Sequence, residues 1–234
     1  MAADFFPPNR TYARCAIGPA EVHLRLVNLD DERWDGFIAS LSADEEARAS
    51  RYRTAALAQS YRRGRAALRQ VLAYYAGEAP RRLTLQYGAF GKPALKDHNL
   101  QFNLSHSAGR ALIAVSGDAI GVDLEWIHPS LVVEELAPIV CNGAEHDYLR
   151  NLPADARRIA FFQLWTQKEA YCKALGMGLQ KTLADVAFGE NFGTGPRPVL
   201  DRGAVTMVVH PLAILPGYAA SLCAPGPETA IRWY

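Results

Sequence analysis

The sequence predicts an α+β protein built from two related half-domains, residues 1–118 and 119–234. One pattern, a long helical segment followed by a glycine and a short strand, occurs once in each half. Its two copies are 55–76, Gly77 and 83–87, and 155–175, Gly176 and 184–188. Each half also closes on a similar strand, GRALIAVS at 109–116 and GYAASLCA at 217–224. Repeated patterns of this kind predict an internal duplication, so we expect two similar halves in one chain.

The helices are predicted from their start and stop signals. Ser42 and Glu45 form the S-x-x-E pattern of a capping box, which predicts a helix from there to about Tyr52. A second helix over 55–76 ends at its following glycine. Pro153 suits the first turn of a helix and predicts the start of the last long helix.

Strands are predicted where apolar and polar residues alternate, or where short apolar runs lie between turn residues. The predicted strands are 21–29, 83–87, 101–105, 110–116, 120–127, 184–188, 205–209 and 217–223. Residues 1–20 contain three prolines and show no periodicity, so we expect a lead-in segment there. Gly88, Gly91 and Pro93 predict a loop after the second strand.

The composition is that of an ordinary globular protein of 234 residues, 50% of them hydrophobic. Lys and Arg number 25 against 24 Asp and Glu, and this net charge of +1 argues against a general binder of nucleic acid or acidic membranes. Four cysteines without a C-x-x-C pair are typical of reduced thiols. No apolar run approaches the roughly 18 residues of a membrane span, and no secretory signal pattern is found. We therefore expect a cytoplasmic protein.

Two carboxylates, Asp123 and Glu125, are two residues apart in the predicted strand GVDLEWI, so both face the same side of a sheet. Val122, Leu124 and Trp126 face the other side and are expected in the core. Adjacent carboxylates repel each other, and a basic partner, protonation or a divalent cation must offset the repulsion. A solvated strand face is the simpler alternative. If a cation binds, all-oxygen ligands favour Mg²⁺ or Mn²⁺ over zinc.

A third carboxylate, Glu169, shares one stripe of the last long helix with Trp165, Lys173 and Gly176. On an exposed helix, Glu169 and Lys173 would form a surface ion pair of about 0.3–0.5 kcal/mol. The neighbouring residues are mainly aromatic or apolar, so we expect the helix to be packed on nearly all sides. A metal-binding carboxylate and a phosphate-binding lysine one turn away would explain charges on such a helix.

Arginines are concentrated in one segment that contains no acidic residue. Between Ala47 and Gly77 they are Arg48, Arg51, Arg53, Arg62, Arg63, Arg65 and Arg69. A solvated helix surface is the common explanation, but such a concentration in an otherwise neutral protein favours recognition of a polyanion. A small ligand with several phosphates fits better than nucleic acid, because no nucleic-acid recognition motif is present.

Two further motifs offer phosphate donors. Gly91-Lys92-Pro93 places a lysine on a tight loop, although this sequence is often only a turn. In N-L-S-H-S at 103–107, Ser105 and His106 reach a turn where a hydroxyl and a ring N–H can donate to phosphate. An ordinary loop histidine is the alternative for His106. No G-x-S-x-G motif marks Ser105 as a nucleophile.

Four motifs, in this order, resemble those of the Sfp-type 4′-phosphopantetheinyl transferases: G-K-P at 91–93, N-L-S-H-S at 103–107, G-V-D-L-E at 121–125 and W-x-x-K-E-A-x-x-K-A-x-G-x-G at 165–178. The resemblance implies an α+β pseudo-dimer of two similar halves, each with a long helix packed on a small antiparallel sheet. It also implies Mg²⁺-dependent transfer of the phosphopantetheine arm of coenzyme A to a serine of an apo acyl or peptidyl carrier protein, with release of 3′,5′-ADP. The N-terminal half would bind coenzyme A, and the C-terminal half would hold the metal and dock the carrier.

The resemblance further implies roles for individual residues. The family's Mg²⁺ ligands are matched by Asp123, Glu125 and Glu169. Its coenzyme A contacts are matched by Arg48, Lys92, Ser105, His106, Asp123 and Lys173. The candidate catalytic residues are Glu169, as the base that accepts the serine proton, and Lys173. A metal-bound water is the alternative base.

One departure from the family concerns the adenosine contacts. An arginine that the family often has just upstream of the second helix is replaced by Ser60, and Arg62 or Arg63 is the expected substitute.

Two other functions fit part of the pattern. A non-catalytic module that binds coenzyme A or a nucleotide would be expected to lack one of the three acids, yet all three are present. A metal-dependent phosphohydrolase would be expected to have further His or Asp ligands for a second metal, and the six histidines form no cluster in the sequence. Because a duplicated chain contains its own interface, we expect a monomer without nucleic-acid or membrane partners.

Overall fold

Runs of helices and runs of strands follow one another along the chain in an α+β fold, the class that the sequence predicts. This computed structural model describes residues 15–177, 183–186, 188, 195–201 and 204–234. Its α-helices are α1 (Ala43–Ala49), α2 (Ala55–Ala76), α3 (Val133–Val140), α4 (Gly143–Arg150) and α5 (Ala154–Leu175). Short 3₁₀ helices are η1 (Glu32–Ser40), η2 (Pro80–Arg82) and η4 (Leu183–Asp185). The strands are β1 (Glu21–Asn28), β2 (Leu85–Tyr87), β3 (Pro93–Leu95), β4 (Gln101–Ser107), β5 (Arg110–Ser116), β6 (Gly121–Trp126), β7 (Arg197–Asp201), β8 (Ala204–Pro211), β9 (Tyr218–Ala224) and β10 (Ala230–Trp233).

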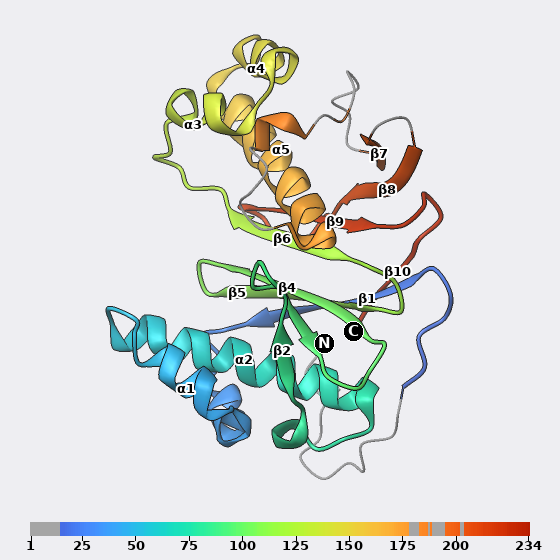
Figure 1. The fold of residues 1–234 in the computed structure, drawn as a ribbon. Coiled ribbons are helices and arrows are strands. Elements are labelled where there is room, and N and C mark those ends of the chain that lie inside the picture. The colour runs from blue at the N-terminus through green and yellow to red at the C-terminus, as the bar shows by residue number, and fades with distance from the viewer. Residues whose placement is uncertain (1–14, 178–182, 187, 189–194, 202–203) are drawn as a thin grey trace.

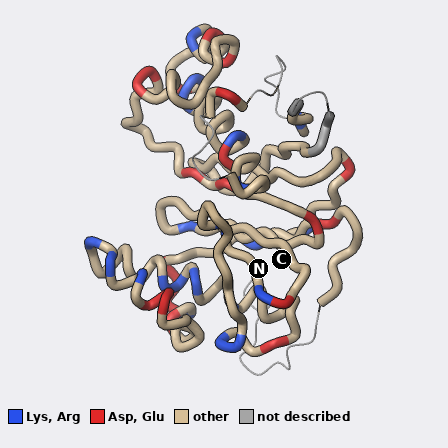
Figure 2. Tube along the Cα trace, in the orientation of Figure 1, with Lys and Arg blue, Asp and Glu red and all other residues tan. Residues whose placement is uncertain are grey.

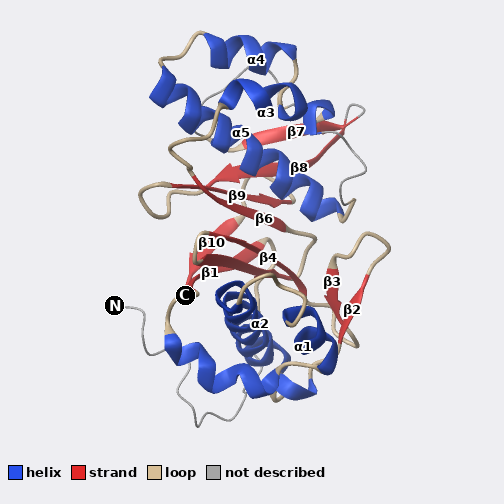
Figure 3. Cartoon of the chain, turned by 90° about the vertical axis from the view of Figure 1, so that its left-hand side faces the viewer, coloured by secondary structure: helices blue, strands red, loops and turns tan. Residues whose placement is uncertain are grey.

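These elements are arranged in four layers (Figures 1 and 3). Two four-stranded sheets face each other, with the strand orders β10-β1-β5-β4 and β6-β9-β8-β7. Helix α2 covers the outer face of the first sheet, and α5 covers the outer face of the second. The β2–β3 hairpin forms a separate two-stranded sheet beside the first. Helices α3 and α4 pack on α5.

The two helices of the first half begin and end on local signals. Ser42 and Glu45 form the predicted capping box of α1, each side chain accepting a hydrogen bond from the other's backbone N–H. Thr54 caps α2, because its side-chain oxygen accepts a hydrogen bond from Leu57 N at 3.2 Å. Gly77 ends α2 with a left-handed φ of +72°, which glycine adopts without steric cost. The predicted start of α1 and both predicted ends of α2 are therefore confirmed.

Apolar side chains fill the spaces between the layers. Leu72 of α2 packs against Ile113 of β5 on the outer side of the first sheet. Leu112 of β5 and Leu222 of β9 belong to one apolar cluster between the sheets. Successive strand residues face opposite sides, so β5 is buried on both faces, which explains its continuous apolar sequence. No helix in the described residues combines the length and hydropathy that crossing a membrane requires.

The last strand returns across the predicted division at residue 118. Strand β10 follows β9 along the chain but pairs in parallel with β1, with Ile231 opposite Val22. The other strands of the first sheet precede residue 118, and all strands of the second sheet follow it. The end of the chain therefore ties the second half to the sheet of the first.

Gly121, the first residue of β6, allows α5 to lie directly on this strand. A Cβ atom at Gly121 would be 2.1 Å from the carbonyl oxygen of Ala170 and 2.3 Å from the nitrogen of Ala174. A side chain at this position would clash with the helix backbone. The close approach brings Glu169 and Lys173 of α5 next to the carboxylates of β6.

Two predictions in the second half are wrong. The segment 184–188 is not a strand where it is described, because 183–185 form η4 and residues 186 and 188 lie outside any strand, while residue 187 lies outside the described residues. The second copy of the helix–glycine–strand pattern is therefore incomplete. Val186 and Phe188 are apolar because both are buried against α5 and the second sheet. Trp126, predicted in the core, is 38% exposed.

Candidate active site

Side chains join β4 to β6 although the two strands belong to different sheets. Three alternate residues of β4 face β6, as the two-residue repeat of a strand requires. Their contacts are Asn103 Oδ1 with Val122 N at 2.9 Å, Ser105 Oγ with Asp123 Oδ1 at 2.7 Å, and Ser107 Oγ with Glu125 Oε2 at 2.8 Å. The N-L-S-H-S motif therefore fixes both carboxylates of β6, which lie on the same side of their strand as predicted.

Lys173 of α5 contacts the same carboxylate. Its Nζ lies 2.5 Å from Asp123 Oδ1 and donates to Ser105 Oγ at 3.0 Å. Because Lys173 reaches across to β6, the alternative of a surface ion pair with Glu169 is not realised. Among the described residues, Glu169 has no ion-pair partner within 4.0 Å.

The three carboxylates bring more negative charge together than Lys173 offsets. Burial and, next, the charge of Asp123 raise the pKa of Glu125 to about 7 from its usual 4.5, and Glu169 adds a smaller effect. Burial also raises the pKa of Glu169, where Asp123 acts in the same direction and Lys173 opposes it. Carboxylates that raise the pKa of one another favour the binding of an added cation.

The donor atoms fit a hard divalent cation. Asp123 is 1% exposed, and its Oδ2 has no hydrogen-bond partner within the described part of the chain. A buried carboxylate oxygen without a partner is unfavourable unless a ligand satisfies it. Oxygen donors of this kind suit Mg²⁺ or Mn²⁺. As the described side chains stand, no three of type His, Cys, Asp or Glu are grouped closely enough to hold one ion together.

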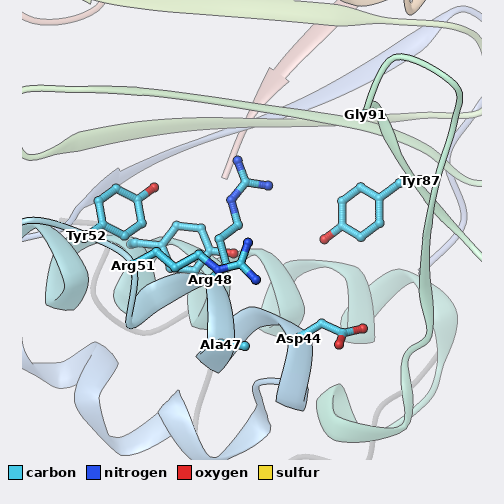
Figure 4. Close-up of a pocket in the computed structure, with 8 residues that line it drawn as sticks. Asp44, Ala47, Arg48, Arg51, Tyr52, Tyr87 and Gly91 are labelled. Atoms are coloured by element: carbon cyan, nitrogen blue, oxygen red, sulfur yellow. The ribbon is translucent and has the colours of Figure 1, made fainter.

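A pocket of about 710 Å³ opens on the first half, between α1 and the β2–β3 hairpin (Figure 4). We call it the arginine pocket; it is lined by Asp44, Ala47, Arg48, Arg51, Tyr52, Tyr61, Tyr87 and Gly91. An adjoining cavity of about 360 Å³ shares part of this lining and extends to Asn103 and His106 on β4. The pocket therefore continues toward β4, the strand whose serines contact the carboxylates of β6.

His106 lines the adjoining cavity and lies on the side of β4 opposite to Ser105 and Ser107, which contact the carboxylates. Burial lowers the pKa of its imidazole, and the positive charges of Lys173 and Arg48 lower it further, against the opposing charge of Asp123. An imidazole that cations surround in this way would be protonated more easily once an anion bound beside it. This side of the cavity is therefore suited to a phosphate.

Comparison with known proteins decides the family. The 4′-phosphopantetheinyl transferase HetI of Nostoc sp. is 39% identical to this chain over 182 residues, which are 75% of each protein. The chain belongs to the 4′-phosphopantetheinyl transferase superfamily. A model of this superfamily matches residues 119–223 of the transferase, a range that includes β6 and α5. The predicted resemblance is confirmed.

Other relatives of the transferase carry the same description. The putative 4′-phosphopantetheinyl transferase slr0495 of Synechocystis sp. is 38% identical over 160 residues, 67% of this chain and 65% of the relative. The 4′-phosphopantetheinyl transferase Sfp of Bacillus subtilis is 26% identical over 140 residues, 59% of this chain and 62% of the relative.

Most arginines of the basic segment of the transferase are paired with acids. Figure 2 shows acidic residues of α1 beside basic residues of α2, which itself contains no acidic residue. The pairs are Arg62 with Glu46, Arg63 with Asp35, and both Arg65 and Arg69 with Glu45. Arg62 and Arg63 are thus paired with carboxylates, and the expectation that one of them replaces the family arginine missing at Ser60 stays a prediction. Ser60 itself lines the adjoining cavity.

Arg48 and Arg51 are the arginines that line the pocket, between Tyr52 and Tyr87 (Figure 4). In the described part of the chain neither forms an ion pair, and the Arg48 guanidinium lies 5.8 Å from the centre of the Tyr61 ring. The sequence analysis missed these tyrosines. The available signal was the position of Tyr52 and Tyr61 within the arginine-rich segment.

The structure thus separates the predicted site residues into two groups and leaves one apart. Arg48 and His106 line the cavity that adjoins the arginine pocket. The group at the joint of the sheets is Ser105, Asp123, Glu125, Glu169 and Lys173. Lys92 joins neither group, because its Nζ donates to the carbonyl oxygens of Ile120 and Ala174, each at 3.0 Å.

Proposed function

We propose that the protein transfers the 4′-phosphopantetheine arm of coenzyme A to a serine of an apo acyl or peptidyl carrier protein and releases 3′,5′-ADP. Membership of the superfamily supports the reaction class. The observation that carries the proposal is the 2.5 Å contact of Lys173 with Asp123, which gathers an ammonium group and carboxylates near a pocket lined by arginines. Coenzyme A has a phosphorylated adenosine on one side of a pyrophosphate, so one molecule fits both regions.

The arginine pocket is the proposed place for the nucleotide. Arg48 and Arg51 have no carboxylate partner among the residues that the structure describes and would bind the 3′-phosphate, since guanidinium groups pair with phosphate oxygens. The tyrosine rings of the lining offer flat surfaces to the adenine. His106, on the way to the carboxylates, would donate to a phosphate of the pyrophosphate.

Asp123, Glu125 and Glu169 are the proposed ligands of Mg²⁺. The partnerless Oδ2 of Asp123 and the raised pKa values of Glu125 and Glu169 support this assignment. When bound, Mg²⁺ offsets charge on the pyrophosphate and on the leaving group. Lys173 adds its own positive charge beside the same group.

Glu169 is the proposed base. During transfer, the serine oxygen forms a bond to the phosphorus that carries the pantetheine arm, and the bond from this phosphorus to the oxygen of 3′,5′-ADP breaks. The serine proton passes to Glu169, a carboxylate that lies beside Asp123 and Lys173 at the same site. Holding both reactants on one protein supplies their orientation.

The proposal extends to the organisation of the chain. Residues 1–118 would bind coenzyme A, and residues 119–234 would supply the metal site and dock the carrier. The idea of two similar halves is supported by α2 and α5, which are each 22 residues long and end on glycines with φ of +72° and +66°. We further infer a monomer in the cytoplasm, with free cysteines.

The mass of an apo carrier protein tests this function. Incubation with the enzyme, coenzyme A and Mg²⁺ should add one phosphopantetheine unit to the carrier, and EDTA should prevent the addition. Release of free phosphate with an unmodified carrier would instead identify a phosphohydrolase. Binding of coenzyme A without either product would identify a non-catalytic module. A panel of apo acyl and peptidyl carriers would name the partner.

A further inference from the structure

Lys92 lies at the base of the tight loop that joins β2 to β3. Two backbone hydrogen bonds close this loop, from Gly88 N to Lys92 O at 3.0 Å and from Gly91 N to Gly88 O at 2.9 Å. Gly91 has a φ of +81°, a conformation that glycine adopts without strain. The loop therefore fixes the backbone from which the Lys92 side chain extends.

The Lys92 side chain crosses to the other half of the protein. Its Nζ donates to the carbonyl oxygens of Ile120 and Ala174, each at 3.0 Å. Ile120 immediately precedes β6, and Ala174 lies in the last turn of α5. The ammonium group thus joins the hairpin of the first half to both elements that carry the carboxylates.

The contact with Ala174 satisfies the end of a helix. The last carbonyl groups of a helix have no partner within it. In α5, the Lys173 carbonyl receives the N–H of Gly176, whereas the Ala174 carbonyl receives the ammonium of Lys92. This places a positive charge at the negative end of the helix dipole.

Gly176 provides the space in which the lysine stem lies. A Cβ atom at Gly176 would be 3.4 Å from Lys92 Cδ and 3.9 Å from Lys92 Cβ, so the stem packs against this glycine. Burial lowers the pKa of Lys92. The surroundings are those of an ammonium group held between protein carbonyls rather than presented to a ligand.

We propose that Lys92 is a positioning residue for the transfer reaction and does not bind phosphate. It fixes the loop next to Tyr87 and Gly91, which line the arginine pocket, relative to α5 with Glu169 and Lys173. The contact thereby fixes the position of the bound nucleotide relative to Glu169 and Lys173, which lie on the other half of the protein. Its kinetic consequence rests on the proposed function, whereas the contact itself does not.

Lys92→Met removes the ammonium group and keeps a stem of similar length. We expect kcat at saturating coenzyme A to fall about 100-fold, because a small displacement of reacting groups has an effect of this size. Affinity for 3′,5′-ADP, measured by calorimetry, should stay close to that of the unchanged protein. Lys92→Arg, which can still donate to carbonyls, should recover most of the lost rate. Lys96→Met is the matched control, since Lys96 is exposed on the same hairpin.

A loss of nucleotide affinity with an unchanged kcat would overturn the inference. A phosphate ligand predicts that Lys92→Met loses about tenfold or more in affinity for 3′,5′-ADP or coenzyme A, with kcat at saturation unchanged. A variant as active as Lys96→Met would also overturn it, because the contact would then have no effect on transfer.

Hydrogen exchange on the unchanged protein gives a second test, which requires neither a variant nor transfer activity. If Lys92 holds the end of α5, addition of coenzyme A should leave the last turn of α5 as protected as before, or more so. If Lys92 binds phosphate, coenzyme A would draw the ammonium away and exchange there would rise. Should the mass assay detect no transfer, the proposed function fails, and this exchange measurement still decides what Lys92 contacts.

Discussion

Ser105 Oγ lies 2.7 Å from Asp123 Oδ1 and thereby joins a strand of the first sheet to a strand of the second. The same hydroxyl accepts a hydrogen bond from Lys173 Nζ at 3.0 Å. Residues from β4, β6 and α5 therefore meet at one point, which lies where the two halves of the chain touch. A reaction site placed there depends on both halves for its geometry.

Replacing Ser105 should destabilise this joint. Ser105→Ala leaves a buried carboxylate without one of its donors, so the free energy of unfolding should fall by about 1–3 kcal/mol. Chemical denaturation followed by circular dichroism measures the change. Ser130→Ala, at an exposed serine, serves as the control. Equal stability of the two variants would show that the Ser105 contact contributes nothing.

Glu169→Gln should separate binding from turnover. The amide keeps the size of the side chain but cannot accept the serine proton, so the transfer rate should fall about 10²–10⁴-fold. Coenzyme A should still bind, as calorimetry with 3′,5′-ADP would show, because the arginine pocket is unchanged. Near-normal transfer by this variant would remove Glu169 from the role of base.

His106 should take up a proton when the nucleotide binds. Its pKa is lowered from 6.5 in the free protein, by burial first and by Lys173 and Arg48 next. The free protein therefore keeps His106 neutral as the pH falls below 6.5, where an unperturbed histidine would be charged. A bound phosphate would favour the charged form and raise the pKa again.

Calorimetry of 3′,5′-ADP binding in buffers of different ionisation enthalpy measures this proton uptake in the pH range below 6.5. The ligand's own titration is common to all variants, so the comparison is with His106→Gln. Uptake should be larger for the unchanged protein than for the variant. Equal uptake would mean that no phosphate approaches His106.

The lowered pKa of His106 also determines how the stability of the protein changes with pH. Because the folded protein holds His106 with a lowered pKa, protonation opposes folding, and stability is lost as the pH falls through the value of the unfolded chain. His106→Gln should therefore lose less stability than the unchanged protein between neutral pH and pH values below 6.5. A parallel decline of both proteins in thermal unfolding would contradict this.

Arg48 and Arg62 should differ in their effect on nucleotide affinity. Arg48 lines the pocket and has no carboxylate partner in the described residues, whereas Arg62 donates to Glu46 at 2.9 Å. Arg48→Met should weaken 3′,5′-ADP binding about tenfold or more, since a charge-assisted contact to phosphate is lost. Arg62→Met should leave affinity nearly unchanged. A similar loss in both variants would indicate a general charge effect instead of a specific contact.

Local signals account for most of what the sequence predicted. Two of these signals are the capping box of Ser42 and Glu45 and the glycine after α2. Both act within one helical turn, so they can be recognised without knowledge of the fold. The shared side of Asp123 and Glu125 follows from the two-residue repeat of a strand. Asn142 and Glu145 form a second capping box at α4 that the same rule would have found.

Long-range contacts account for what could not be predicted. The pairing of β10 with β1 joins segments about 200 residues apart and has no local signal. The sequence predicted the face of the helix on which Lys173 lies. Its partner Asp123 could not be predicted, because that contact depends on how α5 packs on β6. The carbonyl partners of Lys92 are likewise set by the meeting of the two halves. Helix α3 begins without a side-chain cap and contains Pro138, so it carries weak local signals.

Binding of Mn²⁺, in place of Mg²⁺, tests most directly whether three carboxylates share one ion. Electron paramagnetic resonance counts free Mn²⁺ in the presence of coenzyme A and either the unchanged protein or single variants. Asp123→Asn, Glu125→Gln and Glu169→Gln should each weaken Mn²⁺ binding, whereas Asp118→Asn, at an exposed carboxylate, should not. Unchanged Mn²⁺ affinity in any of the three, or an equal loss in Asp118→Asn, would contradict the shared metal site.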